Sequence, residues 1–282
     1  MQRLLGAFVL LTILLTSCNP AETTDLPKGK LFIIGGGKRP AAMIQRMIQE
    51  AGLDKGGYII ILPMASSEPD TAVFYSARQF MEQGFTNITD FRFTKESVAT
   101  ANQLDSIRNA ALIYITGGDQ NAFMNIVAGT AVEDAIKTCY RRGGMIAGTS
   151  AGAAVMSEKM ITGNELKQTD YRETFRTIEA GNIELGTGLG LIITAIVDQH
   201  FVWRSRHNRL ITAVIEHLEL KGIGIDEATA ILVSGKKAEV VGDSQVLVYE
   251  NPERKSTINK NQKLGAQNLK LRVLLPGDTF DL

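Results

Sequence analysis

Apolar runs of strand length alternate along this chain with longer stretches in which apolar residues recur at helical spacing. The short runs are continuous, which is typical of strands covered on both faces. Strands of this kind, separated by helices, form parallel sheets with helices on each side. The sequence therefore predicts strands within residues 30–37, 57–65, 87–93, 111–118 and 144–150, and helices within 40–52, 70–84, 102–110 and 131–142.

The hydrophobic pattern changes in the last part of the chain. From Ala228 onward, short runs of alternating polarity are separated by "SGKK" and "VGDS", which is typical of an antiparallel meander. In a chain that is 44% hydrophobic, about 250 residues are enough to bury one core. We therefore expect an α/β fold with a doubly wound, mostly parallel sheet, in a single domain over residues 30–282 whose β-rich part covers 228–282.

The first residues have the pattern of an export signal. Arg3 precedes an apolar run over residues 4–15 that is too short to remain as a membrane span. The following "LTSC" resembles the bacterial lipobox, in which cleavage comes directly before a cysteine that receives a lipid. We predict a signal peptide over 1–17, lipidation at Cys18 and a polar tether over 18–29. The mature protein would be exported and anchored by this lipid to a membrane of the cell envelope. The alternative is an ordinary signal peptide with a chance cysteine.

Charge and cysteine content argue against two classes of protein. The chain has 30 basic and 30 acidic side chains, and removal of residues 1–17 takes away only Arg3, which leaves 29 basic ones. A near-neutral balance argues against a nucleic-acid partner. The chain has two cysteines. With Cys18 lipidated, Cys139 has no partner, so the fold cannot depend on an intrachain disulfide.

Four glycine- or proline-containing segments follow the predicted parallel strands. They read "GGGKRP", "PMASSEP", "TGGDQ" and "GTSAG". Loops at the carboxyl ends of parallel strands form the binding crevice of open α/β sheets. We therefore expect these four segments to meet in space.

One of these segments contains a candidate nucleophile. Residues Gly148–Gly152, "GTSAG", fit the G-x-S-x-G turn that lifts a serine hydroxyl out of a junction between strand and helix. The Ala151 amide, at the start of the following helix, would donate to an oxyanion beside Ser150. The alternative is a glycine-rich turn that only packs. The segment Gly35–Gly37 lacks the full spacing of a phosphate-binding loop, so we favour a close turn beneath Ser150.

A serine nucleophile needs a base, and the chain has three histidines. His207 and His217 fall inside a helix predicted over residues 203–220. His200 instead ends an apolar run, where a strand gives way to a helix. This position makes His200 the best-placed base.

Four motifs together resemble a known family. The segments "TGGDQ", "GTSAGAAVM", "DQHFVWRSRHNRL" and "GIGIDEATA" occur in the family's order. They look like cyanophycinase and its relative dipeptidase E, a family of serine exopeptidases, over about Lys30 to Leu247. The resemblance implies a flavodoxin-like sheet related to class I glutamine amidotransferase domains. It also implies a Ser-His-Glu triad formed by Ser150, His200 and Glu227.

The residues alone leave the acid of this triad open. A carboxylate on the imidazole Nδ1–H would fix the histidine tautomer, and both Asp226 and Glu227 follow a short predicted strand. Asp226 is therefore a competitor. Glu165 is a second one, because an acid shortly after the nucleophile also fits the family resemblance. The polar segment over residues 164–182 is longer than its counterpart in the family, so we expect a lid or a specificity loop there.

The loop "TGGDQ" supplies further atoms of the predicted site. A glycine there lets the backbone approach a substrate closely, which makes the Gly118 N–H the expected second oxyanion donor beside that of Ala151. Gln120 matches a position that contacts substrate in the family.

Three arginines in "WRSRHNRL" indicate the kind of substrate. Arg204, Arg206 and Arg209 lie close together along the chain, which by itself is typical of a solvated helix face. The resemblance implies instead that all three line the pocket, and guanidinium groups bind carboxylates bidentately. We therefore expect an acidic or β-aspartyl peptide such as cyanophycin, a poly-aspartate backbone with arginine on each side chain. Asp198 and Gln199 would face the cationic part of such a substrate.

These residues predict an exported serine exopeptidase of the cyanophycinase type, which releases β-Asp-Arg dipeptides and requires no metal ion or organic cofactor. Two alternatives stay open. One is an α-aspartyl dipeptidase like dipeptidase E, and the other is a non-catalytic lipoprotein that binds acidic peptides. The sequence also leaves open the scissile bond and the oligomeric state, including a homodimer.

Overall fold

The computed structural model describes residues 27–97, 99–168, 170 and 174–282. The predicted signal peptide, the lipidation site Cys18 and most of the predicted tether lie outside these ranges. Within them, no helix combines the length and the apolar character needed to cross a membrane.

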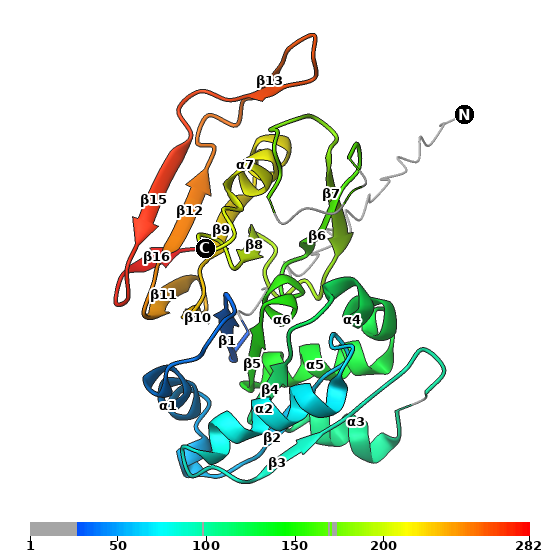
Figure 1. The fold of residues 1–282 in the computed structure, drawn as a ribbon. Coiled ribbons are helices and arrows are strands. Elements are labelled where there is room, and N and C mark those ends of the chain that lie inside the picture. The colour runs from blue at the N-terminus through cyan, green and yellow to red at the C-terminus, as the bar shows by residue number, and fades with distance from the viewer. Residues whose placement is uncertain (1–26, 98, 169, 171–173) are drawn as a thin grey trace, which may run out of the picture.

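A central sheet of eight strands organises the molecule (Figure 1). Its order is β16-β11-β10-β1-β5-β4-β2-β3, and the five strands from β1 to β3 pair in parallel. Each strand expected in the first half of the chain belongs to this parallel part. The parallel strands are β1 (Lys30–Ile34), β2 (Ile59–Leu62), β3 (Ile88–Asp90), β4 (Leu112–Ile115) and β5 (Met145–Thr149).

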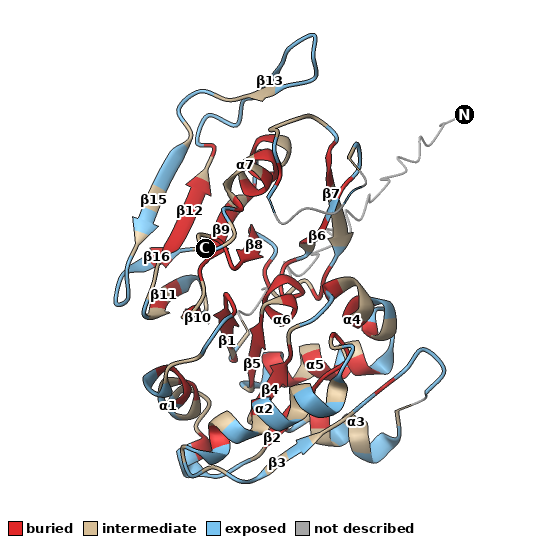
Figure 2. Cartoon of the chain, viewed as in Figure 1, coloured by how far each residue is buried: buried red, intermediate tan, exposed pale blue. Residues whose placement is uncertain are grey.

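Helices cover both faces of the parallel strands. Successive side chains of a strand point to opposite faces, and here both sets are apolar: Phe32 and Ile34 pack with α1 and α2, whereas Leu31 and Ile33 pack with α3 to α6. Figure 2 shows β1 and β5 buried along their length, while the helices mix buried and exposed positions. The helices of this half are α1 (Ala41–Glu50), η1 (Leu53–Lys55), α2 (Pro69–Met81), α3 (Ala101–Arg108), α4 (Gln120–Val127), α5 (Ala131–Arg142) and α6 (Ala151–Ala154).

The order of the parallel strands differs from the predicted flavodoxin-like order. Counted along the chain, these strands lie in the order first, fifth, fourth, second, third. The flavodoxin order is second, first, third, fourth, fifth. Continuous apolar runs identify buried strands, but they do not specify which buried strands become neighbours.

The C-terminal strands are antiparallel, as the alternating pattern predicts, but they do not form one meander. The hairpin β10–β11 and strand β16 extend the central sheet beyond β1. Strand β12 instead joins a second sheet of order β15-β12-β9-β8, where both of its faces are buried. Its two faces contact different core clusters. The strands are β10 (Thr229–Ser234), β11 (Lys237–Gly242), β12 (Val246–Glu250), β15 (Lys270–Leu274) and β16 (Thr279–Asp281).

The second sheet carries the segment that contains the candidate base. Its strands β8 (Ala195–Gln199) and β9 (Lys221–Ile225) are parallel, and α7 (His207–Glu216) packs against β9. The helix predicted over 203–220 is therefore shorter than expected. Residues 201–206 form turns because Ser205 has a φ of 50° and two backbone N–H groups of this segment donate to Asp226.

Two hairpins complete the described chain. Strands β6 (Lys159–Glu165) and β7 (Ile183–Thr187) pair beside β8, and β13 (Thr257–Ile258) pairs with β14 (Leu264–Gly265).

A crevice opens where β1 and β5 end side by side. The chain leaving β1 leads to α1 on one face of the sheet, whereas the chain leaving β5 leads to α6 on the other face. Such a divergence at the carboxyl ends of parallel strands creates a binding crevice. The second sheet reaches the same point, because the His200 N–H donates to the Gly35 carbonyl at 2.7 Å.

Candidate active site

Ser150 lies in the sharp turn between β5 and α6. Its φ of 54° and ψ of −111° are rare for a residue with a side chain. The flanking glycines permit this turn, since a Cβ on Gly148 would lie 2.2 Å from the Gly152 carbonyl oxygen. The Ser150 N–H donates to the Ile34 carbonyl at 3.0 Å. The glycines of "GTSAG" thus present the serine at the crevice, and β1 holds it there.

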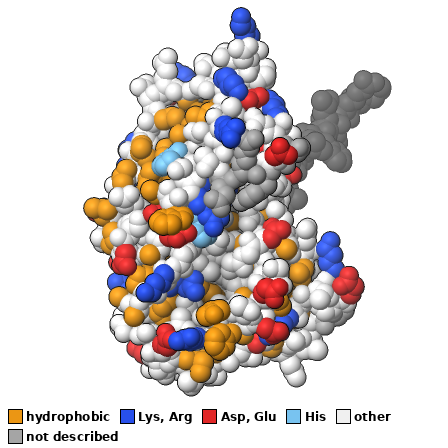
Figure 3. Space-filling model, viewed as in Figure 1, with side chains coloured by type: hydrophobic (Ala, Val, Ile, Leu, Met, Phe, Trp, Pro, Cys, Tyr) orange, Lys and Arg blue, Asp and Glu red, His pale blue; other side chains and the backbone are white. Residues whose placement is uncertain are grey.

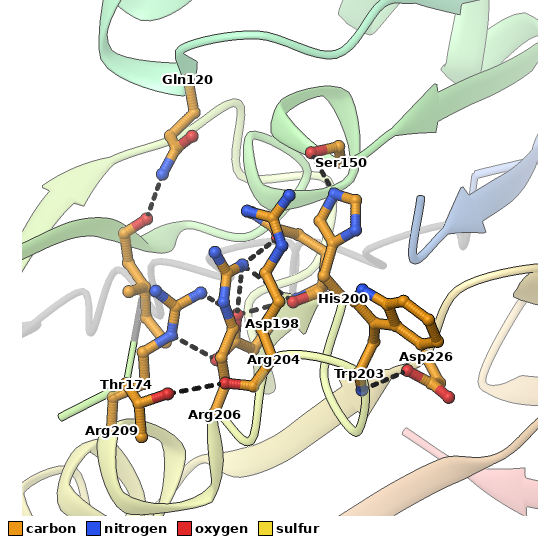
Figure 4. Close-up of polar contacts among 12 residues, drawn as sticks. Gln120, Ser150, Thr174, Asp198, His200, Trp203, Arg204, Arg206, Arg209 and Asp226 are labelled. Atoms are coloured by element: carbon orange, nitrogen blue, oxygen red, sulfur yellow. Dashed lines mark hydrogen bonds and ion pairs between the residues drawn. The ribbon is translucent and has the colours of Figure 1, made fainter. Parts of the chain in front are cut away.

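His200 joins Ser150 to a carboxylate. It follows β8 directly and has a φ of 50°. Its Nε2 lies 2.9 Å from Ser150 Oγ, and its Nδ1 lies 2.6 Å from Glu227 Oε1. Figure 4 shows the imidazole pointing toward the serine hydroxyl. The three side chains form a continuous hydrogen-bonded line of the kind used for nucleophilic catalysis.

The two competing acids are bonded elsewhere. Asp226 accepts from two backbone N–H groups of the turn after the histidine, at 3.1 and 2.9 Å, and from a serine hydroxyl at 2.7 Å. Glu165 is buried in the β6–β7 hairpin and accepts from Asn182 at 2.7 Å. Of the three candidates, Glu227 is the one whose carboxylate reaches His200.

The Gly35–Gly37 turn lies beneath His200 and Glu227 rather than beneath the nucleophile. A Cβ on Gly36 would lie 2.2 Å from His200 Cε1, and one on Gly37 would lie 2.7 Å from Glu227 Oε2. Both glycines have positive φ. The close turn forms as predicted, but its neighbours were predicted wrongly, because the base and the acid come from a second sheet whose position the sequence does not specify.

The two predicted oxyanion donors belong to Gly118 and Ala151, which lie in the loop after β4 and directly after the nucleophile. Gly118 has a φ of 139°, and a Cβ there would lie 1.9 Å from the Ala65 carbonyl oxygen, so a side chain does not fit. Gly118 lines a pocket together with Ser150. Helix α6, which begins at Ala151, is a single turn. The Ala151 N–H is therefore a local donor, and the predicted contribution of a helix dipole is small.

The electrostatic surroundings keep His200 neutral. Burial lowers the pKa of His200 from its ordinary value, the hydrogen bond that its Nδ1–H donates to Glu227 acts in the opposite direction, and the cations Arg204 and Arg206 lower it again. The net effect is a lowered pKa, so the imidazole is unprotonated at neutral pH. A neutral imidazole can accept the serine proton.

A pocket of about 350 Å³ opens beside Ser150. Figure 3 shows basic side chains gathered next to a histidine near the middle of this face. One wall is formed by residues from the end of β8, the turns after it and the first turn of α7, and the other by the N-terminal end of α4 and by β6. The first wall contains Gln199, Arg204, Arg206 and Arg209, and the second contains Asp119, Gln120, Asn121, Thr162, Gly163 and Asn164.

The arginines do not form a solvated face. Arg206 and Arg209 are only 4% and 2% exposed. Arg209 donates through Nε to Asp198 at 2.7 Å and through Nη2 to the other oxygen of the same carboxylate (Figure 4). Asp198 is 1% exposed and is not among the residues of the pocket walls. The expectation that Asp198 faces substrate is therefore wrong, because this carboxylate neutralises a buried guanidinium instead.

The two glutamines each hold a wall of the pocket. The side chain and carbonyl of Gln199 both accept from Arg206. Gln120 donates to the carbonyls of Ile161 and Thr162 at 2.9 and 2.8 Å and so ties α4 to β6. The β6 wall was missed by the sequence analysis. Polar residues in a hairpin look like an ordinary exposed strand, so no local signal marks them.

A serine hydroxyl, an imidazole and a carboxylate joined by hydrogen bonds at the crevice of an open α/β sheet are typical of a serine-type hydrolase. Within the described ranges, no three His, Cys, Asp or Glu side chains are grouped so as to hold a metal ion. The model of "Peptidase family S51" matches residues 31–241. The chain therefore belongs to peptidase family S51 and is a serine-type peptidase, as the four motifs predict.

Curated relatives and solved structures agree with this family. The chain is 34% identical to the cyanophycinase of Trichormus variabilis over 272 residues, which cover 93% of this chain and 88% of that protein. It is 31% identical to the cyanophycinase of Geminocystis herdmanii over 268 residues, 90% of this chain and 94% of that protein.

Two solved structures share the fold. A peptidase from an acI-B1 Actinobacterium superimposes with a TM-score of 0.62 at 21% identity, covering 90% of this chain and 97% of that one. A putative peptidase E from Listeria monocytogenes superimposes with a TM-score of 0.53 at 17% identity, covering 77% of this chain and 99% of that one. The mixed α/β architecture with a large central sheet is therefore common to these peptidases.

Proposed function

We propose that the mature chain is a lipid-anchored exopeptidase that hydrolyses aspartyl or β-aspartyl peptide bonds and releases β-Asp-Arg dipeptides, as expected of a cyanophycinase-like enzyme. The observation that carries this proposal is the hydrogen-bonded line of Ser150, His200 and Glu227. Its serine lies in a pocket that is lined by arginines. An idle binding lipoprotein would not need these three side chains at hydrogen-bonding distances.

In the proposed reaction Ser150 Oγ attacks the carbonyl carbon of the scissile bond while His200 Nε2 takes the hydroxyl proton. The carbonyl electron pair moves onto its oxygen, where the N–H groups of Gly118 and Ala151 stabilise the charge. His200 then donates its proton to the leaving amine. Water, deprotonated by the same imidazole, then attacks the acyl carbon, and the imidazolium returns the proton to Ser150 Oγ as the bond between Oγ and the acyl group breaks. Glu227 accepts from Nδ1–H throughout and stabilises the imidazolium.

The arginine wall supports an acidic substrate. Arg204, Arg206 and Arg209 all line the pocket, and guanidinium forks bind carboxylates in a bidentate manner. The relatives named cyanophycinase support the same substrate class. We infer that the pocket takes the carboxylate-bearing part of an aspartyl unit.

The test of this function is a panel of substrates with purified mature protein. Cyanophycin and matched α- and β-linked aspartyl dipeptides are incubated with wild type and with Ser150→Ala, and a fluorophosphonate probe labels the nucleophile. We expect cleavage of β-linked substrates and labelling of wild type only. Cleavage of α-linked dipeptides alone would favour the dipeptidase E alternative. Tight binding of acidic peptides with neither labelling nor cleavage would favour the binding lipoprotein.

The lipid anchor is a separate part of the proposal and has its own test. It is supported by "LTSC" and lies outside the described residues. Metabolic labelling with a palmitate analogue should mark wild type and the Cys139→Ser control, and should miss Cys18→Ser. Equal labelling of the Cys18→Ser protein would remove the anchor but leave the peptidase proposal intact.

A further inference from the structure

Trp203 is an exposed indole three residues after the candidate base. Its side chain is 75% exposed. The backbone beneath it is fixed, since the Trp203 N–H donates to Asp226 Oδ1 at 2.9 Å and the next N–H donates to the His200 carbonyl at 2.9 Å. A large apolar ring held on a rigid turn is unusual beside a polar site and is well suited to stack on a ligand.

The indole and the arginine pocket lie on opposite sides of the nucleophile. In Figure 4 Ser150 and His200 stand between Trp203 on one side and Gln120 and Arg209 on the other. A peptide whose scissile bond sits at Ser150 therefore extends in two directions. One part enters the pocket, and the other part leaves past the indole.

Charge indicates which part of the substrate lies on which side of Ser150: the acidic part in the arginine pocket and the cationic part beside the indole. The pocket walls carry three guanidinium groups, those of Arg204, Arg206 and Arg209, against the wall carboxylate of Asp119 and the buried carboxylate of Asp198 that pairs with Arg209. The balance stays positive, so a further guanidinium from the substrate is disfavoured there. Asp198, which was expected to meet the cationic part, is buried against Arg209. The arginine side chains of an aspartyl–arginine substrate must therefore find another partner.

We propose that Trp203 forms a subsite for a guanidinium side chain of the substrate, outside the arginine pocket. This inference rests on the proposed function and adds the residue that recognises the cationic part. The face of an indole carries negative potential and attracts a cation placed over it, and a planar guanidinium also stacks on it.

The experiment compares two substrates that differ only in charge. Both have a poly-aspartate backbone, and the β-linked side chains are arginine in one and citrulline, its neutral isostere, in the other. Wild type should show a higher kcat/KM for the arginine substrate by about 2- to 5-fold, as an exposed cation–π contact gives. Trp203→Ala should lose this preference and keep its rate on the citrulline substrate. Trp203→Phe should retain part of the preference.

A matched control is Phe74→Ala, which removes another exposed aromatic side chain, 59% exposed and located on α2. This variant should keep the wild-type preference. The subsite is refuted if Trp203→Ala keeps the preference, or if it loses activity equally on both substrates. An active wild type without any preference also removes the subsite and leaves the peptidase proposal standing. A wild type that cleaves neither substrate removes the proposed function itself.

Discussion

Two clusters of polar side chains at the site, the catalytic line and the Asp198–Arg209 pair in the pocket wall, are held in different ways. In the catalytic line, Ser150 and His200 both have strained backbone with positive φ, and single hydrogen bonds join them to each other and to Glu227. In the wall cluster, Asp198 and Arg209 are almost fully buried and joined by two parallel bonds. The first arrangement lets a proton move, whereas the second keeps a wall rigid. Charged residues that share a site therefore need not share in its reaction.

The comparison is tested most strongly at the nucleophile. Ser150→Ala should lower kcat by about 10⁶-fold, because the attacking oxygen is lost from a unit that works only when complete. The free energy of unfolding should change by less than about 1 kcal/mol, since the Ser150 side chain holds no core contact. His200→Ala should behave alike, and the double variant should be no worse. Measurements are kcat on an aspartyl dipeptide and thermal unfolding. Undiminished turnover in Ser150→Ala would overturn the assignment of the site.

Glu227 and Asp226 are neighbours in the chain but have different roles: the first orients the base and the second supports the turn after it. Glu227→Gln should lower kcat by about 10⁴-fold, because the amide no longer stabilises the imidazolium. Asp226→Asn should retain most of its turnover and instead lose about 1–3 kcal/mol of stability, since its two bonds to the turn lose the carboxylate charge and its amide nitrogen cannot accept from the Ser244 hydroxyl. Kinetics and denaturant unfolding of the two variants provide the measurement. If Asp226→Asn is inactive and Glu227→Gln is not, the acid has been misassigned.

The wall cluster should respond in stability more than in chemistry. Asp198→Ala leaves the Arg209 guanidinium buried without its carboxylate and should cost about 3–5 kcal/mol in the free energy of unfolding. The double variant Asp198→Leu with Arg209→Met should recover much of this loss, because no charge is then buried. Urea unfolding measures both. A stable, inactive Asp198→Ala protein would instead mean that this carboxylate takes part in the reaction.

The smallest predicted effect is on the pH profile. It concerns the influence of an arginine of the pocket wall on the base of the catalytic line. Arg204 lowers the pKa of His200 by charge repulsion. Its replacement in Arg204→Gln should therefore raise that pKa, so on acidification the base becomes protonated, and activity falls, at a higher pH than in wild type. The acidic limb of the kcat/KM profile reports the shift. Arg108→Gln, a change at an exposed ion pair on α3, serves as the control and should leave the limb in place. A shift to lower pH, or none, would mean that Arg204 does not act on the base.

Local patterns in the sequence determined much of this fold. Continuous apolar runs identified four of the five parallel strands of the central sheet, because burial on both faces requires them wherever the strand lies. The fifth, the edge strand β3, is only partly buried and was identified from the alternation of strands and helices. The same runs did not specify that β5 lies between β1 and β4, or that the C-terminal strands divide between two sheets. Those choices depend on pairing between segments far apart in the chain, and any buried strand presents the same apolar faces to many partners.

The site divides in the same way. The sequence by itself determined the sharp turn at Ser150 and the close backbone approach at Gly118, because both require small residues at fixed local spacing. Only the tertiary structure decided that Glu227 rather than Asp226 meets His200, and that Asp198 meets Arg209 instead of the pocket. A carboxylate has the same chemistry in every case. Its role depends on which distant donor the packed sheets bring to it, and this is a property of the whole fold.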